Sequence, residues 1–599
     1  MSGPHPLTAE ASLLLRQGRA REALALLDQR VAEAPDDLDA LKGQALCRYQ
    51  VGDAAGAAQA FAQLVEARPG DASSWASLAR VRLDLNDHYG AEQALRRLIE
   101  LRPGDAAARG QLLNLLMARQ AWSDIVALGP SEAPDQQGLY ARALAALERN
   151  TEAIAAYQAI PRRTAEQEAD LAVLCHGERR FAEARRAAQA ALDGGLDVAA
   201  VWLVKAKSEV PLILPEEARE SLRRAAALDF RNSAILMEQV QLDWMASGDP
   251  AALEPLERRA RETPDDAEAW RGLARARLFA LGPAAAYEAA AEAARRHPKD
   301  LGLQLDAVTA AAEAGEPRAA LAHALTARGL GAADEQVGGA ETMALLGVGE
   351  AATAEALATR LVRGQPGNQL YLALLASAWR QKGDPRYGRL YDYARVVRPR
   401  LIETPEGWSS LDAFLSDLAA ELERLIPYRA PPFGQSTRDA VQTVGDLTRR
   451  DEPVIRALFV ELSRAIETHI AEMRAEAANW PPEMISRLAP HWRFNGAWSV
   501  IQRAGGHHAD HVHPAGWLSS AFYVRAPEQA LGQGHEGWIQ FGRPGFPAQP
   551  PLPPEHFVRP QPGMLVLFPS YMWHGTEPFT TGEVRHTVAF DVIPSASPA

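Results

Sequence analysis

Prolines recur at a fixed interval along the first two thirds of the chain, and this interval constrains the fold more than any other feature. A proline interrupts a helix, so a constant spacing indicates one helical unit that is repeated, with each copy ending at its proline. Repeated helix pairs stack side by side into a solenoid. Pro35, Pro69 and Pro103 are 34 residues apart, Pro264 and Pro298 repeat that interval, and Pro366 lies two intervals further on; we call these six the grid prolines.

The residues between these prolines fit pairs of antiparallel helices. Small alanines at the crossing points let two helices approach closely, and large apolar residues three and four positions apart fill the space between them. The segments after Pro69 and Pro264 resemble the tetratricopeptide repeat family at its expected positions. Those positions hold Trp75, Leu78, Ala91, Leu95 and Pro103 in the first segment, and Trp270, Leu273, Ala286, Ala293 and Pro298 in the second.

The repeat pattern is weaker in the middle of the solenoid. Between about residues 105 and 260 the phase is lost, although helical periodicity continues, as in "FAEARRAAQAALDGG". We interpret this region as degenerate repeats with insertions, and predict an all-α tetratricopeptide-type solenoid over residues 1–384. The concave surface of such a solenoid commonly binds proteins or peptides, so we expect a partner of that kind. The alternative is a scaffold that only spaces or dimerises the attached domain.

The alanine-rich pattern ends near residue 384, and we predict a second domain over residues 385–599. Residues 385–490 are expected to form a helical lead-in, followed by a β core over residues 491–595 with a period of two. Short strands rich in aromatic and β-branched residues, separated by Gly and Pro turns, favour a small barrel or jelly roll. The predicted strands lie in "GAWSVIQ", "LSSAFYVRAP", "GWIQFGRP", "GMLVLFP" and "RHTVAFDVI".

The segment "HHADHVHP", residues 507–514, gathers four histidines and an aspartate in front of one of these strands. Residues i and i+2 of a strand point the same way, so His511 and His513 can both reach one metal ion. The overlapping pair His508 and Asp510 would give the commoner triad of two histidines and one carboxylate. His574 follows another predicted strand and supplies a third imidazole. A histidine-rich loop that collects metal incidentally is the alternative.

The order of these residues, with Arg585 eleven positions after His574, resembles the Fe(II)- and 2-oxoglutarate-dependent oxygenases. The domain is similar to the oxygenase domains of this type that are attached to tetratricopeptide repeats in bacteria. That resemblance implies a double-stranded β-helix, with Fe(II), 2-oxoglutarate as cosubstrate and O₂. The matching segments are "GQSTRDAVQT", "HVHPAGWLSSAFYV", "GWIQFGRP", "PGMLVLFPSYMWHGTEP" and "RHTVAF".

The resemblance aligns "HVHP" with the family's motif, so the predicted metal ligands are His511, His513 and His574. His508 and Asp510 would lie farther from the following strand. His513 could also stand back from the metal, as the corresponding position does in aspartyl/asparaginyl β-hydroxylases.

The resemblance assigns the cosubstrate to Arg585 and Thr587. The planar guanidinium of Arg585 suits the distal carboxylate of 2-oxoglutarate through two parallel charge-assisted bonds, and the hydroxyl of Thr587, two residues on, can add a third. No catalytic residue is predicted beyond the metal site.

These features predict a dioxygenase that hydroxylates a protein or peptide recruited by the solenoid. An oxygenase of small molecules and a non-catalytic repeat adaptor with a structural jelly roll are the alternatives. The net charge of −13, without a dense Lys/Arg block, gives no electrostatic footprint for nucleic acid or an anionic membrane. No signal-like start or long apolar run is found, so a cytoplasmic location is expected.

Overall fold

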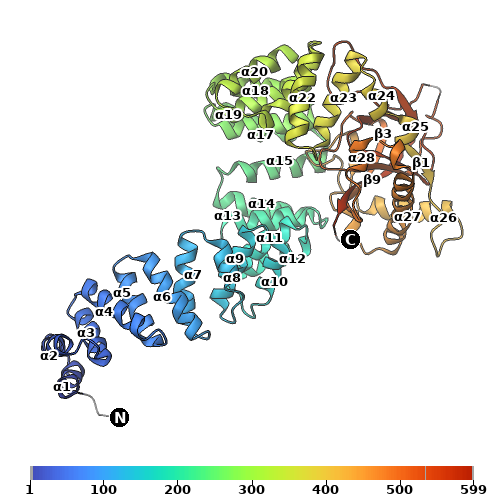
Figure 1. The fold of residues 1–599 in the computed structure, drawn as a ribbon. Coiled ribbons are helices and arrows are strands. Elements are labelled where there is room, and N and C mark those ends of the chain that lie inside the picture. Colours follow the sequence, from blue (N-terminus) through green and yellow to red (C-terminus); the bar gives the residue numbers. More distant parts are fainter. Residues whose placement is uncertain (1–4, 533, 597–599) are drawn as a thin grey trace. The chain divides into compact units, whose positions relative to one another are not determined.

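The computed structural model describes residues 5–532 and 534–596, and the chain divides into two compact units. The first unit spans residues 1–197 and the second spans residues 198–599. Paired helices form the first unit and begin the second, and antiparallel sheets complete the second unit (Figure 1). The predicted class, an α-solenoid followed by a jelly-roll domain with flanking helices, is confirmed.

The first unit consists of helices that pack against their neighbours in the chain. They are α1 (Pro6–Arg16), α2 (Ala20–Glu33), α3 (Leu38–Gln50), α4 (Ala54–Ala67), α5 (Ala72–Asp84), α6 (His88–Leu101), α7 (Ala106–Ala118), α8 (Trp122–Ala127), α9 (Pro134–Ala146), α10 (Asn150–Gln158), α11 (Ala165–Gly177) and α12 (Phe181–Asp193).

The proline grid sets where helices begin as well as where they end. Two residues after each grid proline, an Asp or Asn side chain accepts hydrogen bonds from the first backbone amides of the next helix. These otherwise unpaired amides are the groups that an N-cap satisfies, at a gain of about 1 kcal/mol per cap. The capping residues are Asp37, Asp71, Asp105, Asp266, Asp300 and Asn368.

The second unit continues the helix pairs. Its repeat helices are α13 (Ala199–Glu209), α14 (Pro215–Leu228), α15 (Ser233–Ser247), the 3₁₀ turn η1 (Pro250–Leu253), α16 (Glu254–Glu262), α17 (Ala267–Ala280), α18 (Pro283–Arg296), α19 (Leu301–Glu313), α20 (Pro317–Gly329), α21 (Asp334–Gly347), α22 (Ala351–Gly364) and α23 (Gln369–Lys382). Where the sequence loses the repeat phase, the chain remains helical, with the short helix α8 and the extra turn η1 as irregularities.

The remaining elements form the β domain. They are α24 (Arg386–Leu390), α25 (Tyr393–Val396), β1 (Arg398–Leu401), α26 (Leu411–Arg424), β2 (Thr437–Gln442), η2 (Leu447–Arg449), α27 (Pro453–Ala475), η3 (Ala477–Asn479), α28 (Pro482–Ile485), β3 (His491–His508), β4 (Leu518–Arg525), β5 (Ile539–Phe541), β6 (His556–Val558), β7 (Met564–Pro569), β8 (His574–Thr576) and β9 (Arg585–Ser595).

Two antiparallel sheets make up the β domain. The larger has the order β1-β7-β4-β9-β3-β2 and the smaller the order β6-β5-β8. Each of the five predicted strand segments contains an observed strand, namely β3, β4, β5, β7 and β9. The lead-in is not purely helical, however, since it contributes β1 and β2, the two edge strands of the larger sheet. Both are short and polar, so they carry little strand signal in the sequence.

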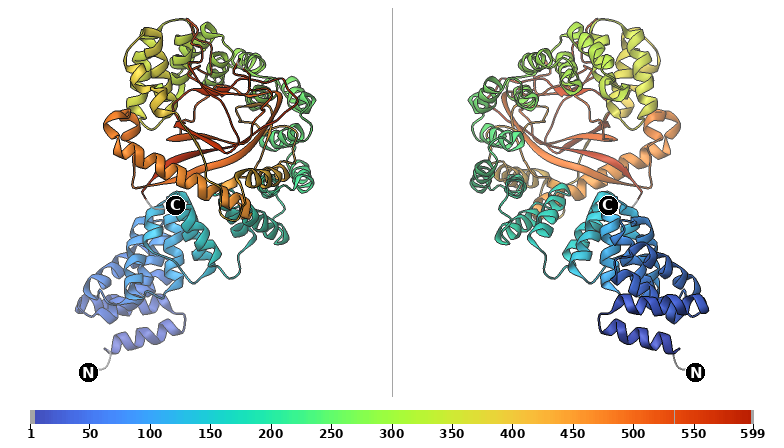
Figure 2. Two further views of the ribbon diagram at one scale, coloured as in Figure 1. Left: turned by 90° about the vertical axis from the view of Figure 1, so that its right-hand side faces the viewer. Right: turned by 90° about the vertical axis from the view of Figure 1, so that its left-hand side faces the viewer.

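Repeat helices and β sheets of the second unit share one hydrophobic core. It joins Leu346 and Leu374 of the repeats to Phe522, Leu567 and other strand residues. Figure 2 shows the helices from α13 onward following the sheets in an arc. The change of pattern at residue 384 falls between α23 and α24, whereas the compact units divide after Asp197. The division into domains 1–384 and 385–599 therefore stays a prediction.

Among the described residues, no helix combines the length and the apolarity needed to cross a bilayer.

A buried histidine far from the predicted site gives the fold a measurable pH dependence. His469 of α27 is fully buried, and neither of its ring nitrogens has a hydrogen-bond partner among the described residues. Burial, followed by the charges of Arg400 and Arg398, lowers the pKa of His469 to about 3. The unfolded chain, with an ordinary pKa of about 6.5, therefore takes up this proton first as the pH falls. Stability is lost progressively from about pH 6.5 downward.

We expect His469→Leu to reduce the loss of unfolding free energy between pH 7 and pH 5 by about 2 kcal/mol, the linkage of one and a half pH units at one site. Denaturant unfolding of the full chain at both pH values measures this difference. The exposed His491 provides the control, since His491→Leu should leave the pH dependence unchanged. If the His469→Leu variant had the same pH dependence as the wild type, His469 would take up its proton as readily in the native protein as in the unfolded chain. That result would contradict the expected loss of stability.

Candidate metal centre

Backbone pairing brings two of the predicted ligands together. His511 and His574 form an isolated antiparallel bridge, in which each backbone amide donates to the other residue's carbonyl oxygen, at 2.9 and 3.1 Å. Side chains directly opposite each other in such a pair emerge on the same face. The close approach requires glycine at position 575, where an added Cβ would lie 2.5 Å from Asp510 Oδ1 and 2.9 Å from the His508 carbonyl oxygen.

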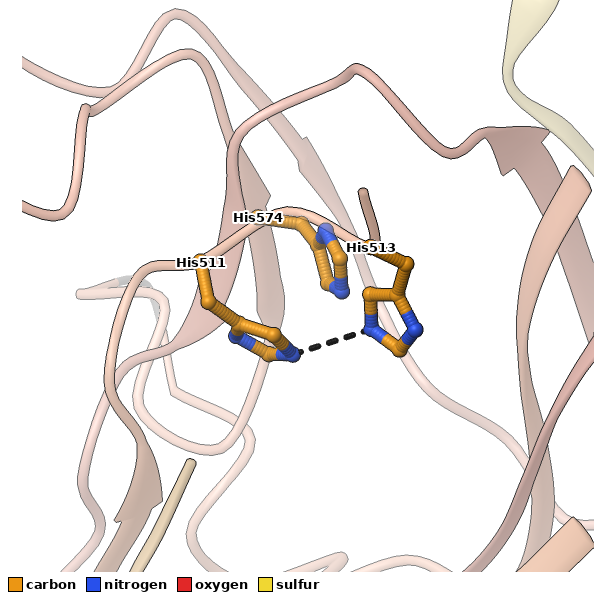
Figure 3. A group of neighbouring side chains, drawn as sticks. All are labelled: His511, His513 and His574. Carbon is orange, nitrogen blue, oxygen red and sulfur yellow. Dashed lines mark hydrogen bonds between the residues drawn. The ribbon is translucent and has the colours of Figure 1, made fainter. Parts of the chain in front are cut away.

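The third imidazole, that of His513, completes a compact cluster (Figure 3). One possible ligand atom from each of His511, His513 and His574 lies within 4.8 Å of the others. The Nε2 atoms of His511 and His513 are 3.1 Å apart. Two nitrogens bound at right angles to one ion, each about 2.1 Å from it, would be about 3.0 Å apart. His511 and His513 therefore have the spacing of two neighbouring positions around one metal ion, and His574 lies close enough to supply a third ligand.

The hydrogen bonds of the rings fix which nitrogen faces the cluster. Nδ1 of His511 lies 2.7 Å from the Ala509 carbonyl oxygen, and Nδ1 of His574 lies 2.9 Å from that of Met572. An acceptor at Nδ1 keeps the proton on that nitrogen and leaves the Nε2 lone pair free. The Nε2 atoms of His511 and His513 face each other at 3.1 Å, as the dashed line in Figure 3 marks.

A buried carboxylate orients His513. Nδ1 of His513 lies 2.6 Å from Asp591 Oδ2, and the other carboxylate oxygen accepts a hydrogen bond from Ser519 Oγ at 2.8 Å. Asp591 is 7% exposed. Carboxylates in this position fix the orientation of a metal-binding imidazole and raise its basicity. The carboxylate of Asp591 therefore lies one hydrogen bond away from the imidazole cluster.

Burial disfavours the protonated forms of His511 and His574. Burial and the neighbouring His513 lower the pKa of His511 to about 3. Burial, followed by the charge of His511, holds the pKa of His574 well below its ordinary value. Unprotonated imidazole is the form that binds a metal, so protons compete little for these nitrogens.

The side chains of the alternative ligand pair, His508 and Asp510, make other contacts. Asp510 accepts hydrogen bonds from Arg543 and Gln540, and its carboxylate forms an ion pair with Arg543. His508 lies beside the cluster, with its ring centroid 6.2 Å from that of His511 and its Nδ1 3.3 Å from Ser436 Oγ. The structure therefore brings together His511, His513 and His574 without Asp510.

Arg585 is buried in the same cavity without an acidic partner. It lies on β9 and is 2% exposed, with Nη1 donating to Gln502 at 2.7 Å and Nη2 to the Tyr523 hydroxyl at 3.3 Å. Its Nε has no hydrogen-bond partner, and the guanidinium forms no ion pair within the described ranges. A buried cation without a counter-ion is costly unless an anion joins it.

Alternate residues of β9 face the cavity, as expected for a strand. Arg585, Thr587, Ala589 and Asp591 all line it, together with the three histidines. The cavity, which we call the metal cavity, has a volume of about 620 Å³. Thr587 is therefore on the same wall as Arg585. The sequence analysis did not predict Asp591 as a residue of the site. Its even spacing from Arg585 along one strand was the signal that could have identified it.

The last repeat helix, α23, braces both segments that carry the histidines. The amide of Gln369 donates to the Pro514 carbonyl oxygen at 2.9 Å, directly after His513. The indole of Trp573, the neighbour of His574, donates to Ser377 Oγ at 3.1 Å. Repeat residues also line the metal cavity, among them Phe279. The repeats thus form part of the site.

Comparisons with known proteins agree with this arrangement. Residues 496–591 match the family described as "Putative 2OG-Fe(II) oxygenase". Residues 8–72 and 49–106 match the tetratricopeptide repeat family. The architecture that the sequence resemblance implied is confirmed: the chain combines N-terminal tetratricopeptide repeats with a C-terminal domain of the oxygenase type.

Other comparisons are less informative. No curated protein matches the chain. A chain described as "Structure of Naa15/Naa10 bound to HypK-THB" aligns at 13% identity and TM-score 0.33, over 65% of this chain and 63% of its own length. "Crystal Structure of the Yeast Tom70" aligns at 16% identity and TM-score 0.32, over 64% of this chain and 89% of that one. The present chain thus spans less than two thirds of the first of these chains.

The geometry predicts which imidazoles bind metal. His511→Ala and His574→Ala should each abolish binding of Fe(II), or of Co(II) as a stable substitute, because two imidazoles alone make a weak site. His508→Ala is the matched control and should leave binding nearly intact, since that ring lies outside the cluster. Calorimetric titration under anaerobic conditions measures the affinities. If His508 and His511 exchanged these behaviours, the ligand assignment would be wrong.

Asp591 should matter through His513 rather than through direct contact. We expect Asp591→Asn to weaken metal binding by roughly 10- to 100-fold, the usual effect of removing a partner of a metal-binding histidine. Titration with Co(II) gives the affinity, and the visible spectrum of Co(II) reports any change in the ligand field. Ser520→Ala serves as control, because that hydroxyl bonds only the Phe590 backbone. Equal effects of both substitutions would contradict the role of Asp591.

Proposed function

We propose that this protein is an Fe(II)- and 2-oxoglutarate-dependent oxygenase that hydroxylates a C–H bond of a protein or peptide substrate. The observation that carries the proposal is the pairing, within one cavity, of a cluster of three imidazoles with a buried guanidinium that forms no ion pair among the described residues. The imidazoles suit a divalent metal, and the guanidinium suits an anion. A metal-chelating dicarboxylate satisfies both at once.

The residues present fit these two groups. Three neutral nitrogen ligands on one side of an ion leave positions open for a bidentate cosubstrate and for O₂, as in non-haem Fe(II) oxygenases. We assign the metal to Nε2 of His511, His513 and His574. In this assignment all three ligands are neutral, and Asp591 supplies the compensating charge through His513.

We assign the distal carboxylate of 2-oxoglutarate to Arg585, with Thr587 as an additional donor on the same wall. The hydrogen bonds from Arg585 to Gln502 and Tyr523 hold the guanidinium plane in place before any ligand arrives. This preorganisation reduces the entropy that binding would otherwise cost. The unpartnered Nε is an available donor.

When bound, iron and 2-oxoglutarate supply the oxidation: 2-oxoglutarate, O₂ and R–H give succinate, CO₂ and R–OH. The chain's own part is to bind and orient the reactants and to limit access of water. Trp498 and Trp573 line the metal cavity beside its polar wall, and Phe279 and Met343 line it from the repeats. A cavity with such walls keeps bulk water from the reacting atoms.

The alternatives account for less of the structure. A structural jelly roll in an adaptor protein gains nothing from a buried, uncompensated Arg585, which lowers stability when no anion is bound. An oxygenase of small molecules needs the same metal and cosubstrate groups, so only the substrate distinguishes it. Repeat residues in the wall of the metal cavity support a polypeptide substrate, because tetratricopeptide repeats commonly bind proteins.

Succinate formation tests the proposal. Purified protein with Fe(II), ascorbate and 2-oxoglutarate should form succinate, and a size-fractionated cell extract should stimulate it through its protein fraction. His574→Ala gives the background without a metal site. Absence of succinate with every fraction, from a protein shown to be folded, would favour the adaptor, whereas stimulation by the small-molecule fraction alone would favour the other oxygenase.

The same assay with Arg585→Ala separates the cosubstrate site from the metal site. We expect 2-oxoglutarate affinity to fall about 100-fold or more, because two charge-assisted hydrogen bonds of about 1.5–3 kcal/mol each are lost. Metal affinity should persist. Arg503→Ala, on the exposed face of β3, is the control and should change neither affinity. Equal loss of metal and of 2-oxoglutarate would contradict the assigned role.

A further inference from the structure

A second cavity lies on the repeat helices next to the metal cavity. It has a volume of about 630 Å³ and is lined by residues of α13, α15, α17, α18 and α19. We call it the repeat groove. Its lining mixes apolar side chains such as Met237 with charged ones, and all of the residues that line it belong to repeats.

The repeat groove is continuous with the metal cavity. Leu278, Phe279 and Glu313 line both of them. Helix α17 follows the groove from Glu268 to Phe279, a distance of about 16 Å at 1.5 Å per residue. An extended polypeptide covers that distance with about five residues. A ligand that occupied both cavities would therefore be much larger than a typical metabolite.

Most charges in the groove are already paired. Lys207 lies 3.6 Å from Glu238, and Arg271 forms ion pairs with Glu268 and Asp306 at 2.8 and 2.7 Å. Arg275, which is exposed and also lines the groove, forms no ion pair among the described residues.

Glu313 is the acidic exception, and it lies at the junction of the two cavities. Its carboxylate forms no hydrogen bond or ion pair among the described residues, although the charge of Arg438 is near enough to act on it. It is the last residue of α19, where the helix dipole is negative and favours a nearby cation. Burial raises the pKa of Glu313, and the charge of Arg438 only partly opposes this effect. Arg438 itself is engaged by the carbonyl oxygens of Gln435 and Thr437.

Resting on the function proposed above, we propose that the repeat groove holds an extended segment of a polypeptide substrate, and that Glu313 binds a Lys or Arg side chain of that segment next to the residue that enters the metal cavity. A cationic partner satisfies the one carboxylate that the fold leaves unpaired at this point. An acidic flanking residue would be repelled by it.

Synthetic peptide pools test this specificity. Two pools of eleven-residue peptides differ only in the flanking positions, which are Lys or Arg in one pool and Glu in the other, and free lysine and arginine form a third arm. Mass spectrometry follows the gain of one oxygen, and succinate is measured in parallel. The basic pool should be oxidised at least about tenfold faster than the acidic pool, as expected for one desolvated charge pair.

Matched variants locate the effect. Thr309 lines the repeat groove, and Thr326 lies on α20 outside it; both are exposed and bond the carbonyl four residues earlier. Thr309→Trp should reduce peptide oxidation at least about tenfold through a raised KM, whereas Thr326→Trp should not.

Glu313→Gln should remove the preference between the two peptide pools, and Glu313→Lys should reverse it. Glu316→Gln, at an exposed position that lines neither cavity, should behave as wild type.

Equal rates for the two peptide pools would overturn the proposal, as would oxidation of free lysine or arginine as fast as of peptides, or wild-type activity of Thr309→Trp. A wild-type protein that binds metal and 2-oxoglutarate but modifies no peptide also overturns it, while leaving the proposed oxygenase in place. Failure to bind the cosubstrate would instead count against the proposed function itself.

Discussion

The two backbone hydrogen bonds between His511 and His574 are the contact on which the site depends. They join the segment after β3 to the start of β8, and so bring histidines from distant parts of the chain to one point. The other features of the site are positioned around this contact. Gly575 permits the approach, Asp591 turns His513 toward it, and β9 carries Arg585 into the same cavity.

Positive charge predominates in the proposed site. Neutral imidazoles leave the charge of a divalent ion largely uncompensated, and the guanidinium of Arg585 adds another positive charge in a buried place. Asp591 offsets only part of this. In the proposed function, a doubly charged anion such as 2-oxoglutarate would offset the charges of both the bound ion and Arg585.

Local spacing in the sequence predicted much of this arrangement. The proline spacing predicted the helix pairs, and strand alternation predicted that Arg585 and Thr587 would share a face. His511 and His513 lie between β3 and β4 and not within a strand, so the bridge of His511 to His574 and the hydrogen bond of His513 to Asp591 position them instead. Cross-strand partners such as Gln502 and Tyr523 depend on strand register, which spacing within one strand does not determine. The contribution of repeat residues such as Glu313 to the cavity depends on tertiary packing across long stretches of chain, for which no local signal exists.

Helix α23 is the last helix of the repeat array, and it also forms hydrogen bonds with the segments around His513 and His574. A recombination event that joined a different repeat array to this oxygenase core would have to preserve that helix, or the site would lose its outer support. The array and the core are consequently expected to have been inherited as one piece, with variation concentrated in repeats farther from the junction.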